Sequence, residues 1–281
     1  MNKLNIDHQA QIIKVLCEGN SIRSTARITG TAVNTVVKLL RDVGAACMDH
    51  HDKVMTNLTC TKLQCDEIWS FCYAKQKNVP EDKQGRFGYG DVWTWVALDA
   101  DSKLVVSYMI GRRDADYANA FMDDLASRLA NRVQLTTDGH HAYLDAISGA
   151  FSHRIDYAML IKLFGPGRPR DPNKIRYSPA KGVKSFPYIV SGNPDPNQVS
   201  TSFVERQNLT MRMSMRRFTR LTNGFSKKIE NHILAIALYF MHYSFARPHK
   251  TLANPYPRTP AMAAGISDHI WTVEEIVRLI N

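Results

Sequence analysis

Residues 91–110 read DVWTWVALDADSKLVVSYMI, and this stretch decides the fold class. Two runs within it, residues 91–99 and 104–110, are rich in the β-branched and aromatic side chains that favour strands. Between them lies Asp99-Ala100-Asp101-Ser102, whose short polar side chains are typical of a turn. We therefore expect an antiparallel β-hairpin at this position.

Further strands and a helix flank the hairpin. The aromatic run IWSFCY, residues 68–73, predicts a strand before it. After it, residues 116–131 place apolar side chains near helical spacing, and the run 132–137 predicts one more short strand. Strands followed by a helix and another strand predict a mixed sheet, so residues 62–255 are expected to form an α/β body.

The segment 160–200 interrupts this pattern. Between Gly165 and Pro196 lie seven of the 12 prolines of the chain, with six Lys or Arg and only two Asp. Because proline breaks regular elements, we expect a loop-rich basic insertion that meets phosphates. Helical spacing returns from about residue 200, and residues 256–281 are expected to form a helical tail with a Thr272–Glu275 capping box.

Residues 1–48 show no strand-like alternation and predict a small all-α domain. Glycines separate three short helical segments, with Ser21 as an N-cap and Gly30 before the third segment. This pattern is typical of a helix-turn-helix DNA-binding unit, although a domain used for packing or oligomerisation fits it too. Residues 49–61 are expected to be a linker. The third helix would present to DNA the side chains of Thr31, Asn34, Thr35, Lys38 and Arg41.

Composition narrows the class of protein. The 281 residues include 36 Lys and Arg against 26 Asp and Glu, a formal net charge of +10, and 44% are hydrophobic. Such a chain can build a core, and its positive charge favours a polyanionic partner. Because we find neither a bilayer-spanning apolar run nor a secretory signal, we expect a cytoplasmic protein. The five cysteines contain no CxxC pair, so free thiols are expected rather than disulfides or a zinc site.

Three acidic residues stand where they could carry chemistry. Asp66 enters the first apolar strand, Asp138 ends a strand before a glycine turn, and Glu205 opens a helix. Each of them taken alone also suits a turn or a helix cap. Carboxylates that meet in space repel one another unless hard cations neutralise them. We therefore expect two Mg²⁺ or Mn²⁺ ions, which can clamp the attacking and leaving oxygens of a phosphodiester.

The surroundings of Glu205 favour this interpretation. Residues 206–228 contain seven basic side chains and no acidic one. On a helix, Glu205 shares a face with Arg212, and Asn208 and Arg216 fall close to that face. Interleaved Met211, Met213, Met215 and Phe218 indicate that one side of this segment packs. We expect phosphate contacts from Arg206, Arg212 and Arg216. Glu67 is left out, because neighbouring strand residues point to opposite faces.

Five motifs, in order and spacing, resemble insertion-sequence transposases of the DDE class, nearest the IS-one family. They are CDEIWS (65–70), DVWTW (91–95), TTDGH (136–140), FVERQN (203–208) and HYSFARPHK (242–250), within about residues 55–255. The resemblance implies a ribonuclease H-like fold with Asp66, Asp138 and Glu205 as the metal-binding triad and Arg212 as its following basic residue. Better-known members begin with a zinc-binding segment. The cysteine spacing here does not supply one, so we expect a plain helix-turn-helix that recognises the terminal repeats.

The predicted function is Mg²⁺-dependent 3′-end cleavage and strand transfer of an insertion sequence. Its partner would be double-stranded DNA, both element ends and target, and pairing two ends implies at least a homodimer. Two rivals stay open, namely a DNA-binding regulator with a non-catalytic body and a ribonuclease H-like nuclease without strand transfer. His140, His141 and His249 fit either phosphate contacts or exposed turns.

Overall fold

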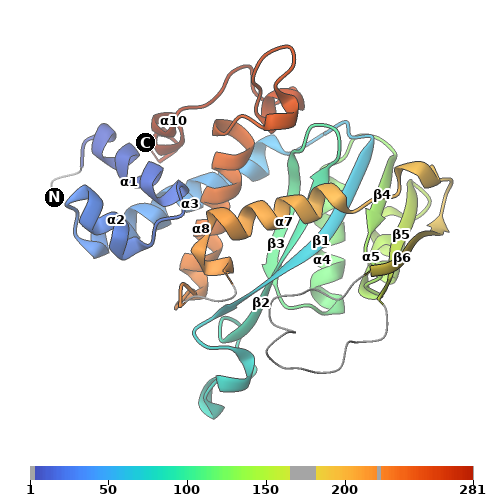
Figure 1. Cartoon of the computed structure of the whole chain (residues 1–281), viewed down its shortest axis with the longest axis horizontal. Coiled ribbons are helices and arrows are strands. Elements are labelled where there is room, and N and C mark those ends of the chain that lie inside the picture. Colours follow the sequence, from blue (N-terminus) through green and yellow to red (C-terminus); the bar gives the residue numbers. More distant parts are fainter. Residues whose placement is uncertain (1–3, 165–181, 220–222, 281) are drawn as a thin grey trace.

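A six-stranded mixed sheet forms the centre of the computed structural model, which describes residues 4–164, 182–219 and 223–280 (Figure 1). The strand order is β3-β2-β1-β4-β5-β6. β1 pairs antiparallel with β2, and β2 with β3, while β4 is parallel to both β1 and β5, and β6 returns antiparallel to β5. The strands are β1 (Lys62–Cys72), β2 (Gly90–Asp99), β3 (Val105–Gly111), β4 (Val133–Thr137), β5 (Ile155–Phe164) and β6 (Gly182–Ser191).

The expected hairpin is confirmed as β2 and β3. Its turn is held by Asp99, whose carboxylate accepts hydrogen bonds from the Ser102 backbone N–H at 2.8 Å and from the Ser102 hydroxyl at 2.5 Å. Lys103 then adopts φ 64°, which returns the chain into β3. The strand expected at 68–73 is longer than predicted and begins at Lys62, so the polar Gln64 and Asp66 lie inside a strand.

Helices cover both faces of the sheet. Those described are α1 (Ile6–Cys17), α2 (Ile22–Thr29), α3 (Val33–Val54), α4 (Ala115–Ser127), α5 (Ala142–Phe151), α7 (Ser202–Ser214), α8 (Ile229–Met241), α9 (Pro260–Ala263) and α10 (Val273–Arg278). Short 3-10 turns are η1 (Gln76–Asn78), η2 (Glu81–Lys83), η3 (Pro196–Gln198), η4 (Arg216–Phe218) and η6 (Lys250–Leu252), and a π-helical turn, η5 (His242–Ala246), extends α8.

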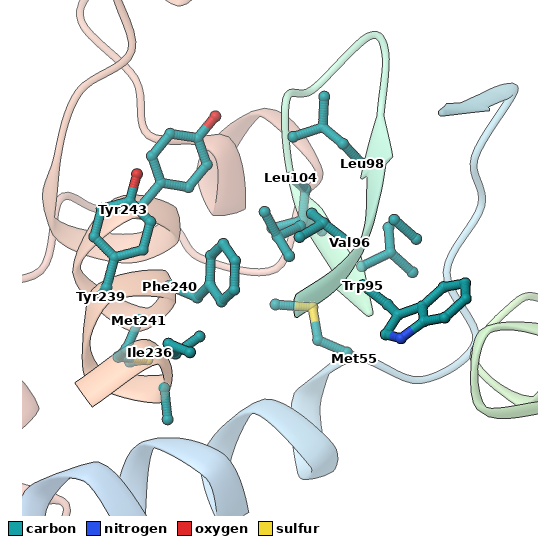
Figure 2. Close-up of a cluster of buried hydrophobic side chains, with 14 of the residues drawn as sticks. Met55, Trp95, Val96, Leu98, Leu104, Ile236, Tyr239, Phe240, Met241 and Tyr243 are labelled. Atoms are coloured by element: carbon teal, nitrogen blue, oxygen red, sulfur yellow. The ribbon is translucent and has the colours of Figure 1, made fainter. Parts of the chain in front are cut away.

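Alternation along β2 separates the two layers. Trp95 is fully buried against Phe121 of α4 and Tyr143 of α5, with ring centroids 5.9 and 5.5 Å away. Its neighbour Val96 faces the opposite layer, where α8 packs. Figure 2 shows Phe240 of α8 on the side of that helix that faces the hairpin strands. Residues that share a face with Trp95 therefore meet α4 and α5, and those that share a face with Val96 meet α7 and α8.

The N-terminal helices pack against later helices of the chain, α3 on α8 and α1 on α10. The linker expected at 49–61 is wrong in its first part, because α3 continues to Val54. The helix continues because it packs on α8. The two helices lie so close that a Cβ placed on Gly44 would be 2.5 Å from the Leu234 carbonyl oxygen. α10, opened by the expected Thr272–Glu275 capping box, contacts α1 (Figure 1). The two ends of the chain thus meet on one side of the sheet.

The loop-rich insertion expected at 160–200 is partly wrong. β5 and β6 occupy its flanks and pair from Tyr157 with Ser191 to Phe164 with Gly182, while residues 165–181 lie outside the described part of the chain. Pro187 is tolerated inside β6 because this strand is at the edge of the sheet, where a missing N–H breaks no second ladder. All five cysteines are free thiols, as expected. No described helix is long and apolar enough to cross a membrane.

The close crossing of α3 and α8 gives a stability test. Gly44→Ala places a methyl group against the Leu234 carbonyl, so we expect a loss of about 1–3 kcal/mol in the free energy of unfolding, measured by urea denaturation. Gly149→Ala in α5 is the matched control, because its Cβ would meet nothing within 4 Å. That variant should be neutral or slightly more stable. Equal effects at the two positions would contradict the packing described here.

Candidate active site

The register between β1 and β4 brings two of the predicted carboxylates together. Leu63 pairs with Leu135 and Gln64 with Thr136, in parallel. Two residues further along, the same register sets Asp66 level with Asp138, which follows the last residue of β4. Because aligned residues of parallel neighbours project to the same face, both side chains leave the sheet at one place. They lie at the carboxyl end of β4, an edge where α/β sheets commonly bind ligands.

A third carboxylate joins them. Asp66, Glu67 and Asp138 each offer a carboxylate oxygen, and these three atoms lie within 4.8 Å of one another. The structure therefore adds Glu67, which the sequence analysis left out, to the candidate ligands. Its side chain does start on the opposite face, since it pairs across the ladder with Trp95. Among the described residues no strand pairs with this side of β1 beyond Gln64, so the two adjacent carboxylates can approach each other at an open edge.

Helix α7 is fixed to β1 directly beside this cluster. The backbone N–H groups of Phe203 and Val204 donate to Gln64 Oε1 at 2.8 and 3.1 Å. One turn later, Asn208 Nδ2 donates to Asp66 Oδ2 at 2.9 Å. Asn208 therefore lies on the side of α7 that faces Asp66. A buried amide of β1 thus sets both the start of the helix and its rotation.

Glu205 lies at the margin of the site. Its carboxylate forms an ion pair with Lys162 of β5 and accepts a hydrogen bond from the Thr201 hydroxyl at 2.5 Å. Its side chain is 43% exposed, and it is not part of the 4.8 Å cluster. It is nevertheless close enough that its negative charge raises the pKa of Asp66. Glu205 therefore lies on the turn of α7 before Asn208, outside the 4.8 Å cluster, with its carboxylate held by a lysine.

The electrostatics of the cluster disfavour three bare carboxylates. Burial, followed by the charge of Asp138, raises the pKa of Asp66 to about 6. Burial also raises the pKa of Glu67 to about 7, although Tyr143 and Arg113 oppose the shift. The hydrogen-bond donors to Asp66 in the described residues are the Asn208 amide and the Glu67 N–H, both neutral. A divalent cation bound between these carboxylates would offset their repulsion.

Two aromatic residues and an arginine surround Glu67. Arg113 Nη2 lies 3.2 Å from Glu67 Oε2, and the Glu67 side chain is 1% exposed. His140 packs on Trp95 and Tyr143, with centroids 6.0 and 5.9 Å away, and burial lowers its pKa. Its backbone N–H donates to Asp138 Oδ1 at 3.0 Å. His140 therefore packs on these rings and helps to orient Asp138, while His141 is exposed.

The basic residues near α7 divide into separate groups. Arg206 is exposed and Arg212 is half-buried, both on α7. The helix ends at Ser214 and Met215 is extended, so Arg216 lies in η4 and does not continue the helical face as expected. Met213 does not pack either, being 74% exposed. His249 uses Nδ1 to hydrogen bond the Thr251 hydroxyl at 2.9 Å.

The N-terminal candidates are also distributed unevenly. Asn34, Lys38 and Arg41 are exposed on α3 and Thr35 is half-buried. Thr31 precedes the helix, and its hydroxyl lies 2.7 Å from His8 Nε2. Lys38 forms an exposed ion pair with Asp42 at 2.5 Å. The expected N-cap is confirmed, since Ser21 Oγ accepts from the Ser24 N–H at 3.0 Å, and Gly30 has φ 63°.

Glu67 and Arg113 are the functional candidates that the sequence did not yield. The adjacency of Asp66 and Glu67 was visible, but only the early end of β4 allows both carboxylates into one cluster. Arg113 follows β3 and reaches Glu67 across β2. No short-range pattern signals such a pair.

Comparisons with known proteins give little beyond the geometry. No protein-family model matches the chain, and no curated protein matches its sequence. Among solved structures, a piggyBac transposase synaptic complex with hairpin DNA is similar at a TM-score of 0.44 and 10% sequence identity. The match covers 99% of this chain and 71% of that chain. A likeness this distant says nothing about function, so the proposal below rests on the residues of the site.

The raised pKa values predict how stability depends on pH. The ordinary pKa values of Asp66 and Glu67 are 3.8 and 4.5, and both pKa values are raised in the folded chain. The folded chain therefore binds these two protons more tightly than the unfolded chain, and this stabilises the fold fully at a pH below the ordinary values. This contribution is lost as pH rises toward about 6 and about 7. Without divalent metal, the free energy of unfolding should fall between pH 4 and 7, by on the order of 2 kcal/mol from Asp66 alone. Asp66→Asn should flatten this fall in urea denaturation, and an unchanged pH profile would contradict the assignment.

Metal binding should offset the destabilising effect of these ionised carboxylates at neutral pH. With Mn²⁺ at about 100 times its Kd we expect Tm to rise by about 5 °C at pH 7.5 over EDTA, and by less at pH 5, where protons compete. Asp138→Asn should lose the rise. Asp116→Asn, an exposed carboxylate on α4, is the matched control and should keep it. A rise that survives in Asp138→Asn would show that the ion binds elsewhere.

Proposed function

We propose that this chain is a divalent-metal-dependent DNA transposase of the DDE class. The observation that carries the proposal is the meeting of Asp66 and Asp138 on adjacent parallel strands, with Glu205 on a helix locked to the same strand. A mixed sheet of this strand order, flanked by helices on both faces, supports a ribonuclease H-like body. Mg²⁺ or Mn²⁺, as two ions, would be the cofactor.

The donor set suits such ions. All the candidate ligands are carboxylate oxygens, which hard divalent cations prefer. In the described part of the chain, the charges that shift the pKa of Asp66 are those of Asp138 and Glu205, both negative. When bound, the ions would supply an acidified water and stabilise charge on the attacking and leaving oxygens of a phosphodiester. Asp66 and Asp138 would hold them from the strands, and Glu205 from the helix once its carboxylate leaves Lys162. Glu67 is a fourth candidate ligand.

The remaining groups orient these ligands. Asn208 fixes the Asp66 carboxylate, the His140 N–H fixes Asp138, and Arg113 fixes Glu67. Arg206 and Arg212 lie on the same helix as Glu205 and would contact phosphates, as would Arg216 in η4. Both proposed reactions are in-line displacements at phosphorus, first by water to free a 3′ hydroxyl and then by that hydroxyl on target DNA. Neither needs a covalent protein intermediate.

Strand transfer tests the catalytic assignment. Asp138→Asn should lower Mg²⁺-dependent joining of a pre-cut DNA end to a target plasmid by about a thousandfold, since a ligand of the reacting centre supplies several kcal/mol. Binding of the same end should persist. Asp116→Asn again serves as the matched control.

The two rivals are outcomes of this assay. A DNA-binding regulator would show no joining with wild-type chain, and its DNA binding would not respond to Asp138→Asn. A nuclease would nick DNA with Mg²⁺ but yield no joined product. Either result would overturn the transposase proposal.

The N-terminal helices are proposed to bind the terminal repeats. Support comes from the capped α2, the left-handed Gly30 and the exposed Asn34, Lys38 and Arg41 on α3, an arrangement typical of a helix-turn-helix unit. Because two DNA ends must be paired, we propose that at least two copies of the chain assemble on DNA.

Binding measurements test this assignment. Arg41→Ala should weaken duplex binding and lower the slope of log Kd against log salt by about 1, as expected when one phosphate contact is lost. Lys53→Ala, an exposed position near the opposite end of α3, is the matched control. An unchanged slope in Arg41→Ala would place the DNA on another face.

A further inference from the structure

A cavity lies beside the carboxylate cluster and shares Arg113 with it. Its volume is about 330 Å³, and it is formed by the segment after η2, the start of β2 and the residues that follow β3. The lining residues that matter are three arginines and three aromatic residues, namely Arg86, Arg112, Arg113, Phe87, Tyr89 and Trp93. Asp91 is the acidic residue in its lining, so the wall has a positive surplus.

Specific contacts hold the shape of this cavity. Arg112 Nη2 donates to the Gly85 carbonyl at 2.6 Å, which ties the loop to the end of β3. Gly88 adopts φ +92°, and a Cβ there would lie 2.8 Å from Ile229 of α8. The loop therefore reverses direction at Gly88, where a residue with a side chain would be strained. These contacts fix the backbone that carries the arginines and aromatic rings of the cavity.

The cavity is connected to the candidate active site through one side chain. The Arg113 guanidinium lies over the Trp93 ring, 4.9 Å from its centroid, and lies 3.2 Å from the Glu67 carboxylate. Glu67 in turn belongs to the cluster with Asp66 and Asp138. A DNA strand with one phosphodiester bound at the carboxylates would thus have its next nucleotide near the cavity.

Aromatic faces beside guanidinium groups suit one kind of ligand. Bases stack on aromatic rings whatever their sequence, and arginine binds phosphate through paired N–H groups. The volume is at the lower end of the range for small-ligand pockets, which fits one nucleotide and no more. We propose that this cavity holds one unpaired nucleotide of the DNA strand next to the phosphodiester at the active site. The proposal rests on the DNA function proposed above and adds a subsite to it.

In this arrangement Trp93 stacks on the base, and Arg86 contacts the phosphate. An unpaired nucleotide enters at lower cost than a paired one, because no base pair has to open. The chain should therefore prefer a DNA end that carries one unpaired nucleotide over a blunt end.

Fluorescence anisotropy with labelled 20-base-pair duplexes, in EDTA, tests the subsite without catalysis. Wild-type chain should bind a one-nucleotide overhang about five- to tenfold more tightly than an abasic overhang, because stacking of one base on an aromatic ring contributes that much to the affinity. Trp93→Leu should abolish this preference, and Trp93→Phe, which keeps an aromatic face, should retain most of it. Arg86→Gln should weaken both overhangs and leave the blunt duplex unchanged. Arg154→Gln, an exposed arginine at the second cavity, is the matched control.

Several results would overturn the subsite. Equal binding of the normal and abasic overhangs by wild-type chain would do so, as would a preference that survives in Trp93→Leu. Removal of the preference by an equal concentration of free deoxynucleoside monophosphate would assign the cavity to a free nucleotide instead. Because no metal is present, failure here leaves the strand-transfer result untouched, and loss of strand transfer leaves the binding result readable.

Discussion

Two carboxylates on neighbouring parallel strands, set level by the register of β1 and β4, are the constraint on which the site depends. Strand pairing fixes their heights to within a residue, because a slip of one position would turn Asp66 to the opposite face. Once they are level and partly buried, their charges repel, and the fold carries that cost at neutral pH. Carboxylates with raised pKa values at a sheet edge are typical of functional sites.

The rest of the site follows from how α7 is attached. Gln64 sits on the same face of β1 as Asp66, and its side chain caps the first turn of the helix. The helix is thereby forced to cross β1 at the carboxylates, which brings Asn208 onto Asp66 and Glu205 to the margin. Lys162 of β5 neutralises Glu205. We propose that this ion pair holds Glu205 at the margin until cations compete with Lys162 for its carboxylate.

The sequence predicted those parts of the molecule that depend on local patterns. The β2–β3 hairpin, the Ser21 cap and the Thr272–Glu275 box each rest on a few adjacent residues, and all are present. Placement of Asp138 at the end of a strand followed from its glycine turn. Local patterns could not show that α3 runs on to Val54, since packing on α8 decides its length.

Other features depend on contacts between distant segments. β5 pairs with β4, and β6 then forms because β5 offers a free edge, although Pro187 lowers the strand tendency of β6. Glu67 enters the cluster because β4 ends early, and Arg113 reaches it from beyond β3. Periodicity correctly put Glu67 on the other face, but it carries no information about how far a side chain reaches at an open strand edge.

Anomalous diffraction from crystals soaked in Mn²⁺ tests directly whether the carboxylates of β1 and of the β4 end bind divalent cations. We expect a strong anomalous peak within bonding distance of both Asp66 and Asp138, and its loss in Asp138→Asn crystals. A structure with Mn²⁺ bound elsewhere and no peak between these two residues would contradict this binding.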